Sequence, residues 1–272
     1  MLAVAVASAP AIATAQERVS SLTGEIRQHD SFASRILGNK RTLRVYLPPD
    51  YDKNRGARYP VLYMHDGQNC FDGMTSYIPN QEWRADEAAQ ALIENRMLRP
   101  LIIVAIDNAG ADRANEFLPT KVKTTVKKYG EFVVGEVMPF ITRTYRTKTG
   151  AKNTALCGSS FGGVATLCIG LNYPTVFGSL GVISPSVWWD DRVLLKIVDA
   201  LPKKTDQKIW VDIGTTEGGD SEGDAAALFD RLAAKGWTPG KNLILYRDRF
   251  AKHNEAAWAG RMDLILQFLI GR

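Results

Sequence analysis

The stretch ALCGSSFGGVATL, residues 155–167, places two adjacent serines between glycines. The apolar residues before Gly158 predict a short buried strand, and the apolar residues after Ser160 predict a buried helix. Glycines at 158, 162 and 163 would let the strand and the helix approach closely through a sharp turn. The stretch therefore predicts a strand–turn–helix unit with Ser160 at its bend, although turns rich in glycine and serine also form without any catalytic role.

The chain around this unit alternates apolar runs with helical patterns. Further apolar runs lie at residues 59–65, 101–107, 177–184, 208–214 and 242–248, and helical patterns lie at 84–95, 129–144 and 255–270. Such runs predict the α/β class, with a mostly parallel central sheet and helices on both faces. Alternating segments at 22–28, 32–37 and 41–47 predict antiparallel strands at the N-terminal end.

The composition is that of an ordinary globular protein: of 272 residues, 45% are hydrophobic and 23% are charged. Neither a linker nor an internal repeat divides the chain, so we expect a single domain over residues 16–272. The net charge of +5 is spread along the sequence, and the lysine-rich stretch 121–128 lacks the aromatic residues of a base-stacking site. We therefore expect no nucleic-acid partner, and no oligomeric state is predicted.

The first residues, MLAVAVASAPAIATAQE, are small and apolar up to Ala15 and polar after it. The stretch is too short for a lasting membrane anchor, and Ala13-Thr14-Ala15 fits the small-x-small cleavage pattern of a secretory signal. No basic residue precedes the apolar run, so we expect residues 1–15 to be part of a signal peptide. The corresponding location is secreted or periplasmic, without stable insertion into a membrane.

Two segments match the G-x-S-x-G pattern of a serine nucleophile, one centred on Ser160 and the other on Ser221. Ser160 follows a predicted strand and opens a predicted helix, which is the context that a nucleophile elbow needs. Ser221 stands in EGGDSEGD, where four acidic residues would oppose a developing negative charge. Ser160 is therefore the expected nucleophile.

A serine nucleophile needs a base, and the chain has three histidines. His29 lies before the predicted parallel sheet, and His65 ends one of its central strands. Hydrolases of this architecture place nucleophile, acid and histidine in that order along the chain. His253 alone follows Ser160, so it is the expected base.

The acid should lie between these two residues, just beyond a strand end. The segment KIWVDIGTTEGGD, residues 208–220, offers Asp212, Glu217 and Asp220. Asp212 falls within the predicted strand, whereas Glu217 lies in the loop, where its carboxylate could reach the imidazole and hold its tautomer. We expect Glu217 to be the acid, with Asp220 and Asp212 as the alternatives.

The oxyanion of an acyl-transfer intermediate needs two backbone N–H donors. One is expected at Phe161, directly after the nucleophile, and the other at Gly67 or Gln68, in the loop after an earlier central strand. No group of histidine, cysteine and acidic residues has the spacing of a metal site, so neither a metal nor a cofactor is expected. The three cysteines show no disulfide pattern.

Six segments together resemble one family: YMHDGQNCFD, IDNAGADRANEF, CGSSFGG, SPSVWWD, DIGTTEGGD and HNEAAW. In this order they are similar to the putative-esterase branch of the α/β-hydrolases, which includes esterase D-like, feruloyl, acetyl and siderophore trilactone esterases. The resemblance covers about residues 22–270 and implies an α/β-hydrolase fold with Ser160, Glu217 and His253 as the triad. Ser159 departs from several relatives at the position before the nucleophile.

The resemblance implies a serine carboxylesterase acting on feruloyl or acetyl esters of glycans, or on siderophore ester bonds. Trp188 and Trp189 follow a predicted strand end, and they and Trp83 are candidates for stacking on substrate; burial in the core is the alternative. Arg113 is expected at the mouth of the site, where it could pair with Glu116. An acyltransferase and a catalytically silent binding protein of the same fold are the rival functions.

Overall fold

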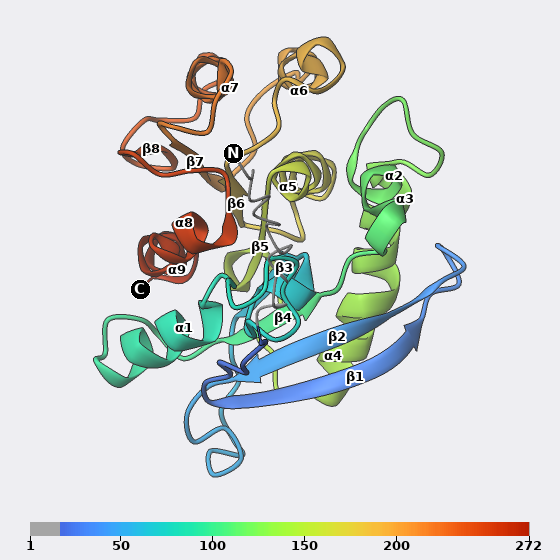
Figure 1. Ribbon diagram of the computed structural model, residues 1–272, viewed down its shortest axis with the longest axis vertical. Helices are drawn as coiled ribbons and strands as arrows, with labels where there is room; N and C mark the ends of the chain where they lie inside the picture. Colours follow the sequence, from blue (N-terminus) through green and yellow to red (C-terminus); the bar gives the residue numbers. More distant parts are fainter. Residues whose placement is uncertain (1–16, 272) are drawn as a thin grey trace, which may run out of the picture.

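An eight-stranded sheet lies at the centre of the computed structural model, which describes residues 17–271 (Figure 1). The strand order is β1-β2-β4-β3-β5-β6-β7-β8, with β1 and β2 antiparallel and β3 to β8 parallel. The predicted fold class is confirmed. The expected signal segment, residues 1–15, lies outside the described residues.

The strands of the parallel part coincide closely with the apolar runs of the sequence. The eight strands are β1 Glu25–Ala33, β2 Lys40–Leu47, β3 Val61–His65, β4 Ile102–Ile106, β5 Thr154–Ser159, β6 Ser179–Ile183, β7 Lys208–Gly214 and β8 Leu243–Asp248. The prediction of three separate N-terminal strands was wrong. β1 continues through an irregularity in register between His29 and Phe32, so two predicted strands are one.

Helices connect the strands and cover both faces of the sheet. They are α1 Ala85–Glu94, α2 Arg113–Phe117, α3 Val126–Phe132, α4 Met138–Thr144, α5 Phe161–Asn172, α6 Trp189–Asp199, α7 Ser221–Ala234, α8 Glu255–Ala259 and α9 Met262–Ile270. A π-helical turn, Val133–Val137, joins α3 to α4. Within residues 17–271, no helix has the length and apolar character needed to cross a membrane.

Two apolar clusters pack on opposite faces of the sheet because successive strand residues point to opposite sides. In β3, Val61 and Tyr63 join the cluster beneath α3 to α7, while Leu62 and Met64 join the cluster beneath α1, α8 and α9. Figure 1 shows α1, α8 and α9 grouped on one side of the strands and α5 on the other. The sheet is thus covered on both faces.

The parallel pairing brings several strand ends to one edge of the sheet. The ends of β3, β5, β6 and β7 are His65, Ser159, Ile183 and Gly214, and the loops that follow them carry most of the predicted site residues. Ligand sites of open α/β sheets lie at this edge.

Candidate active site

Ser160 occupies a strained bend between β5 and α5, with φ 58° and ψ −121°. Its N–H donates to Ile183 O at 3.0 Å, which ties the bend to the neighbouring strand. A Cβ at Gly158 would come within 2.7 Å of Gly162 O and of the His65 ring, so only glycine fits there. The bend therefore depends on the glycines that enclose it, and strain of this kind is concentrated at functional sites.

Glu217 and His253 meet across the loops that follow β7 and β8. Glu217 Oε2 lies 2.7 Å from His253 Nδ1, a contact that leaves Nε2 available on the far side of the ring. The His253 side chain is 37% exposed, whereas that of Glu217 is 2% exposed. A buried carboxylate therefore holds a histidine that solvent and ligands can reach.

The second carboxylate oxygen of Glu217 is held just as firmly. Oε1 accepts from Gly214 N at 2.7 Å and from Ser184 Oγ at 2.6 Å. Burial by itself would raise the pKa of Glu217, but the hydrogen bonds from His253, Ser184 and Gly214 outweigh it, and the pKa lies below its ordinary value. Glu217 is thus a fixed negative charge suited to orienting an imidazole and stabilising its protonated form.

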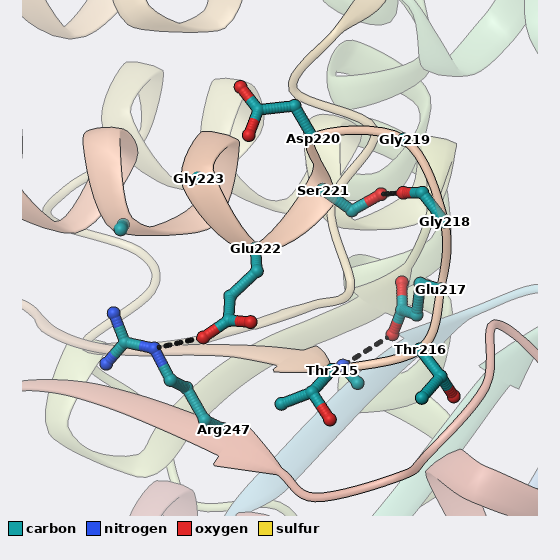
Figure 2. Close-up of a pocket in the computed structure, with 12 residues that line it drawn as sticks. Thr215, Thr216, Glu217, Gly218, Gly219, Asp220, Ser221, Glu222, Gly223 and Arg247 are labelled. Carbon is teal, nitrogen blue, oxygen red and sulfur yellow. Dashed lines mark hydrogen bonds and ion pairs between the residues drawn. The ribbon is translucent and has the colours of Figure 1, made fainter.

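The other two acid candidates are engaged elsewhere. Asp212 is fully buried and accepts from Arg261 Nη2 at 2.9 Å. Asp220 lies on the exposed side of the loop and pairs with Arg192 at 3.2 Å. Figure 2 shows the carboxylates of Asp220 and Glu217 at different ends of this loop. Of the three acids, Glu217 is the one in contact with His253.

The loop after β7 also borders a cavity of about 550 Å³ that contains Ser221 (Figure 2). Ser221 begins α7, and its hydroxyl donates to Gly218 O, while the nearby Glu222 pairs with Arg247 at 3.0 Å. None of the chain's three histidines lines this cavity. Ser221 therefore stands without a base, in contrast to Ser160.

Ser160 and His253 both line a second cavity, of about 750 Å³. Within the described chain, the hydrogen bond of Ser160 Oγ goes to Ser186 Oγ at 3.1 Å, not to the imidazole. Hydrogen bonds between catalytic groups often shorten only when substrate is bound. We call this cavity the Ser160 pocket. It is lined by Arg18, Asp66, Gln68, Asn69, Thr75, Ser76, Tyr77, Ile78, Asn108, Gly110, Arg113, Ser159, Ser160, His253, Glu255 and Trp258.

The two expected oxyanion donors flank this pocket. Phe161 begins α5 directly after Ser160, and Gln68 lines the pocket from the turn that follows β3. Gly67 presses against β4, since a Cβ there would lie 2.6 Å from the carbonyl carbons of Ala105 and Ile106. This close contact fixes where the backbone N–H groups of residues 67 and 68 lie.

Arg113 lines the Ser160 pocket, as expected, but its partner is Asp66. The guanidinium donates to both Asp66 oxygens, at 2.6 and 2.8 Å. Glu116 instead pairs with Arg41 at 2.8 Å in the interior, so the expected pairing of Arg113 with Glu116 was wrong. Asp66 starts the turn that carries Gly67, and the ion pair therefore stabilises the loop in which the second oxyanion donor is expected.

The tryptophans differ from expectation. Trp83 is fully buried and packs edge to face on Trp258, so its placement at the rim was wrong. Trp188 is 56% exposed and Trp189 is half-buried; both contact the ring of Phe161, but neither lines the Ser160 pocket. Trp258 does line it, with its ring centroid 5.1 Å from that of His253.

Sequence reasoning also missed the residues behind Glu217. Ser184, at φ 39°, donates to Glu217 and accepts from Arg261 Nη2 at 2.7 Å and from Trp258 Nε1 at 3.0 Å. Trp258 and Arg261 follow Ser184 by 74 and 77 residues in the chain, respectively. The one signal in the sequence was the position of Trp258 and Arg261, three and six residues after the start of the helix predicted at 255–270.

The two other histidines are structural. His65 is buried against Tyr129, 3.1 Å from its hydroxyl, and His29 lies 2.6 Å from the hydroxyl of Tyr145. Within residues 17–271, no group of three or more His, Cys, Asp or Glu side chains could hold a metal ion.

Comparison with known proteins gives one family match: a family model described as putative esterase fits residues 34–269. The uncharacterized protein YbbA of Bacillus subtilis is 22% identical over 259 residues, which cover 89% of this chain and 97% of YbbA. The endo-1,4-beta-xylanase/feruloyl esterase of Xylanibacter ruminicola is 30% identical over 170 residues, covering 61% of this chain and 22% of that protein. The iron(III) salmochelin esterase of Escherichia coli is 30% identical over 157 residues, covering 57% of this chain and 34% of that protein.

Solved structures share the fold. The enterobactin esterase FES from Shigella flexneri, in the presence of enterobactin, matches with a TM-score of 0.73 and 22% identity, covering 92% of this chain and 59% of that one. The BES protein from Bacillus cereus matches with a TM-score of 0.71 and 19% identity, covering 94% of this chain and 98% of that one. The chain thus spans only part of the Xylanibacter, Escherichia and Shigella proteins, and the structural likeness establishes the fold.

Proposed function

The chain belongs to the putative esterase family, and on that premise we propose that it is a serine carboxylic-ester hydrolase that works through an acyl-enzyme. The observation that carries the proposal is the Glu217–His253 contact of 2.7 Å, beside a pocket that also holds Ser160 on its strained bend. A buried acid, an accessible histidine and a serine at a strand–helix elbow are the parts that acyl transfer needs.

In the proposed mechanism, His253 Nε2 takes the proton of Ser160 as Oγ attacks the ester carbonyl. The carbonyl oxygen becomes an oxyanion that accepts from the N–H of Phe161 and from the N–H of Gly67 or Gln68. His253 then returns the proton to the leaving alcohol, which departs and leaves an acyl group on Ser160. His253 then takes a proton from a water molecule that attacks this acyl group, and it returns the proton to Ser160 Oγ as the acid is released, while Glu217 keeps the imidazole oriented throughout.

The proposed substrates are feruloyl or acetyl esters of glycans, or siderophore ester bonds. The named activities of the Xylanibacter and Escherichia relatives support these classes. Trp188 remains a candidate for stacking on such a substrate, because its indole is exposed and contacts Phe161 next to the nucleophile. We also propose export to the periplasm or medium, which an N-terminus close to Gln16 in the recovered protein would support and a retained Met1 would contradict.

The test compares Ser160→Ala with Ser221→Ala on 4-nitrophenyl acetate. We expect Ser160→Ala to lose several orders of magnitude in kcat/KM with an unchanged Tm, and Ser221→Ala to keep the wild-type rate. Mass spectrometry after treatment with an aryl fluorophosphonate should find the adduct on Ser160. Near-normal turnover by Ser160→Ala would overturn the assignment, and no turnover by the wild-type protein on a panel of aryl, feruloyl and trilactone esters would favour a binding role.

Adding a short alcohol to the same assay separates hydrolysis from acyl transfer. A hydrolase releases free acid as its main product, whereas an acyltransferase forms mainly the new ester, because only the acceptor of the acyl-enzyme differs.

A further inference from the structure

Residues 17–23, which we call the N-terminal strap, are fastened to the loop between β3 and α1. Val19 N donates to Asn80 Oδ1 at 2.8 Å, and Asn80 Nδ2 donates to Glu17 O at 2.8 Å. Ser21 N donates to Asp72 at 3.1 Å, and Ser21 Oγ both donates to Glu82 and accepts from Gly73 N at 2.9 Å. The strap therefore has one defined position on this loop.

The loop beneath the strap forms one wall of the Ser160 pocket. Thr75, Ser76, Tyr77 and Ile78 all line the pocket, and Tyr77 is 81% exposed. The strap adds a residue of its own to this wall, because Arg18 also lines the pocket. A segment far from the catalytic residues in sequence thus completes the site.

Arg18 is anchored, but no carboxylate neutralises it. Its Nη1 donates to the backbone carbonyls of Met74 and Ser76, at 2.9 and 2.8 Å. Among the described residues, no carboxylate oxygen lies within ion-pair distance of Arg18. Within residues 17–271, both carbonyl contacts come from Nη1, so Nη2 and Nε are available to a ligand.

The other charged groups of the pocket already have partners. Arg113 is neutralised by Asp66 at 2.6 Å, and His253 contacts Glu217. Glu255 accepts from Asn69 at 3.2 Å, and burial raises the pKa of its carboxyl group. Among the cationic side chains that line the described pocket, Arg18 is therefore the one that a negatively charged substrate group would contact.

We propose that Arg18 is a specificity-determining residue that favours ester substrates carrying a carboxylate. This inference rests on the proposed ester hydrolysis and adds a substrate class to it. The guanidinium pairs with a carboxylate through two parallel hydrogen bonds, and anchoring by Met74 and Ser76 lowers the cost of ordering the side chain. Neutral esters of the same size lack this contact.

The test uses pairs of esters of matched length, in which one member carries a carboxylate and the other a neutral group in its place. On the acyl side, 4-nitrophenyl adipate is compared with 4-nitrophenyl hexanoate; on the alcohol side, 4-acetoxybenzoate is compared with 4-acetoxybenzamide. We expect Arg18→Gln to lower kcat/KM for the charged member of at least one pair by about two- to five-fold, as for a partly exposed ion pair. The neutral member should change little, and Arg18→Lys should restore part of the preference.

Arg55→Gln is the matched control, because it removes an equal charge from an exposed arginine that does not line the pocket. Equal loss on charged and neutral esters in Arg18→Gln, or no loss on either, would overturn the inference while leaving ester hydrolysis intact. If the wild-type protein hydrolyses none of the four esters and Ser160 takes up no fluorophosphonate, the proposed function itself fails.

Discussion

Arg261 and Asp212 form an ion pair in the interior directly behind the candidate acid, with Nη2 and Oδ1 2.9 Å apart and exposures of 1% and 0%. The same Nη2 donates to Ser184 Oγ, which in turn donates to Glu217 Oε1. Arg261 Nη2 also lies 3.8 Å from Glu217 Oε1, so Arg261 and Ser184 together connect Asp212 with the acid that contacts the imidazole. Two carboxylates five residues apart thus have separate roles, one as a support and one as a partner of His253.

Glu217→Gln should lower kcat/KM by roughly 10³-fold, since the imidazole loses the group that holds its tautomer. Steady-state hydrolysis of an aryl acetate measures this loss. Asp220→Asn is the control, and a comparable loss in that variant alone would transfer the role to Asp220.

Asp212→Asn should act on stability instead. Removing this carboxylate breaks a buried ion pair from one side, which typically costs about 3–5 kcal/mol of unfolding free energy. Arg261 keeps its contacts with Asp248 at 3.3 Å and with Glu217 at 3.8 Å, so we expect a loss at the lower end of this range. Its kcat/KM should fall far less than that of Glu217→Gln, because Glu217 still contacts His253. Urea unfolding and the rate are measured on the same preparation. A loss of kcat/KM as large as that of Glu217→Gln, with unchanged stability, would make Asp212 the catalytic partner and contradict the geometry.

Gly67→Ala should impair both folding and catalysis. The added methyl would lie 2.6 Å from backbone carbons of β4, so the turn with the proposed second oxyanion donor must move. Loss of such a donor costs about 2.7–4 kcal/mol in the barrier, roughly 10²- to 10³-fold in kcat. Gly56→Ala is the control, since its methyl would meet no atom within 4 Å. Equal kcat values in the two variants would remove Gly67 from the proposed site.

His65 should weaken the fold in acid. Burial lowers the pKa of His65 to about 4, so the folded protein keeps the ring neutral where the unfolded chain, with a pKa near about 6.5, takes up a proton. Stability is full above about pH 6.5 and falls as the pH drops toward 4, by up to about 3 kcal/mol. His65→Gln should flatten the dependence of Tm on pH in this range, more than His29→Gln does. Parallel curves for the wild type and both variants would contradict this.

The parallel strands were predictable because burial on both faces leaves a continuous apolar run, as in residues 101–107. The N-terminal strands were less predictable from the sequence. The register of β1 slips between His29 and Phe32, and Ser31 adopts φ 54° there. A strand that continues through such an irregularity loses its simple alternation, so its sequence read as two strands.

Chain order and strand ends restrict the choice of site residues to Ser160, Glu217 and His253. The structure places Glu217 and His253 in contact beside the pocket that Ser160 lines, while their catalytic roles stay a prediction. The ion-pair partners of the charged side chains could not be predicted, because they depend on which side of a helix faces the interior. Arg113 and Glu116 are three residues apart on α2, yet they form separate ion pairs, with Asp66 and with Arg41. Likewise, nothing in the composition around Trp83 distinguishes a rim indole from one packed in the core.

The three cysteines, Cys70, Cys157 and Cys168, are unpaired and buried. Burial raises the pKa of each thiol, to about 12 for Cys168, so almost none is present as the reactive thiolate at neutral pH. A thiol reagent can then reach them only when the surrounding strands and helix separate. The time course of alkylation therefore measures how often the core opens: it requires no engineered cysteine, and each native cysteine reports from its own position in or beside the sheet.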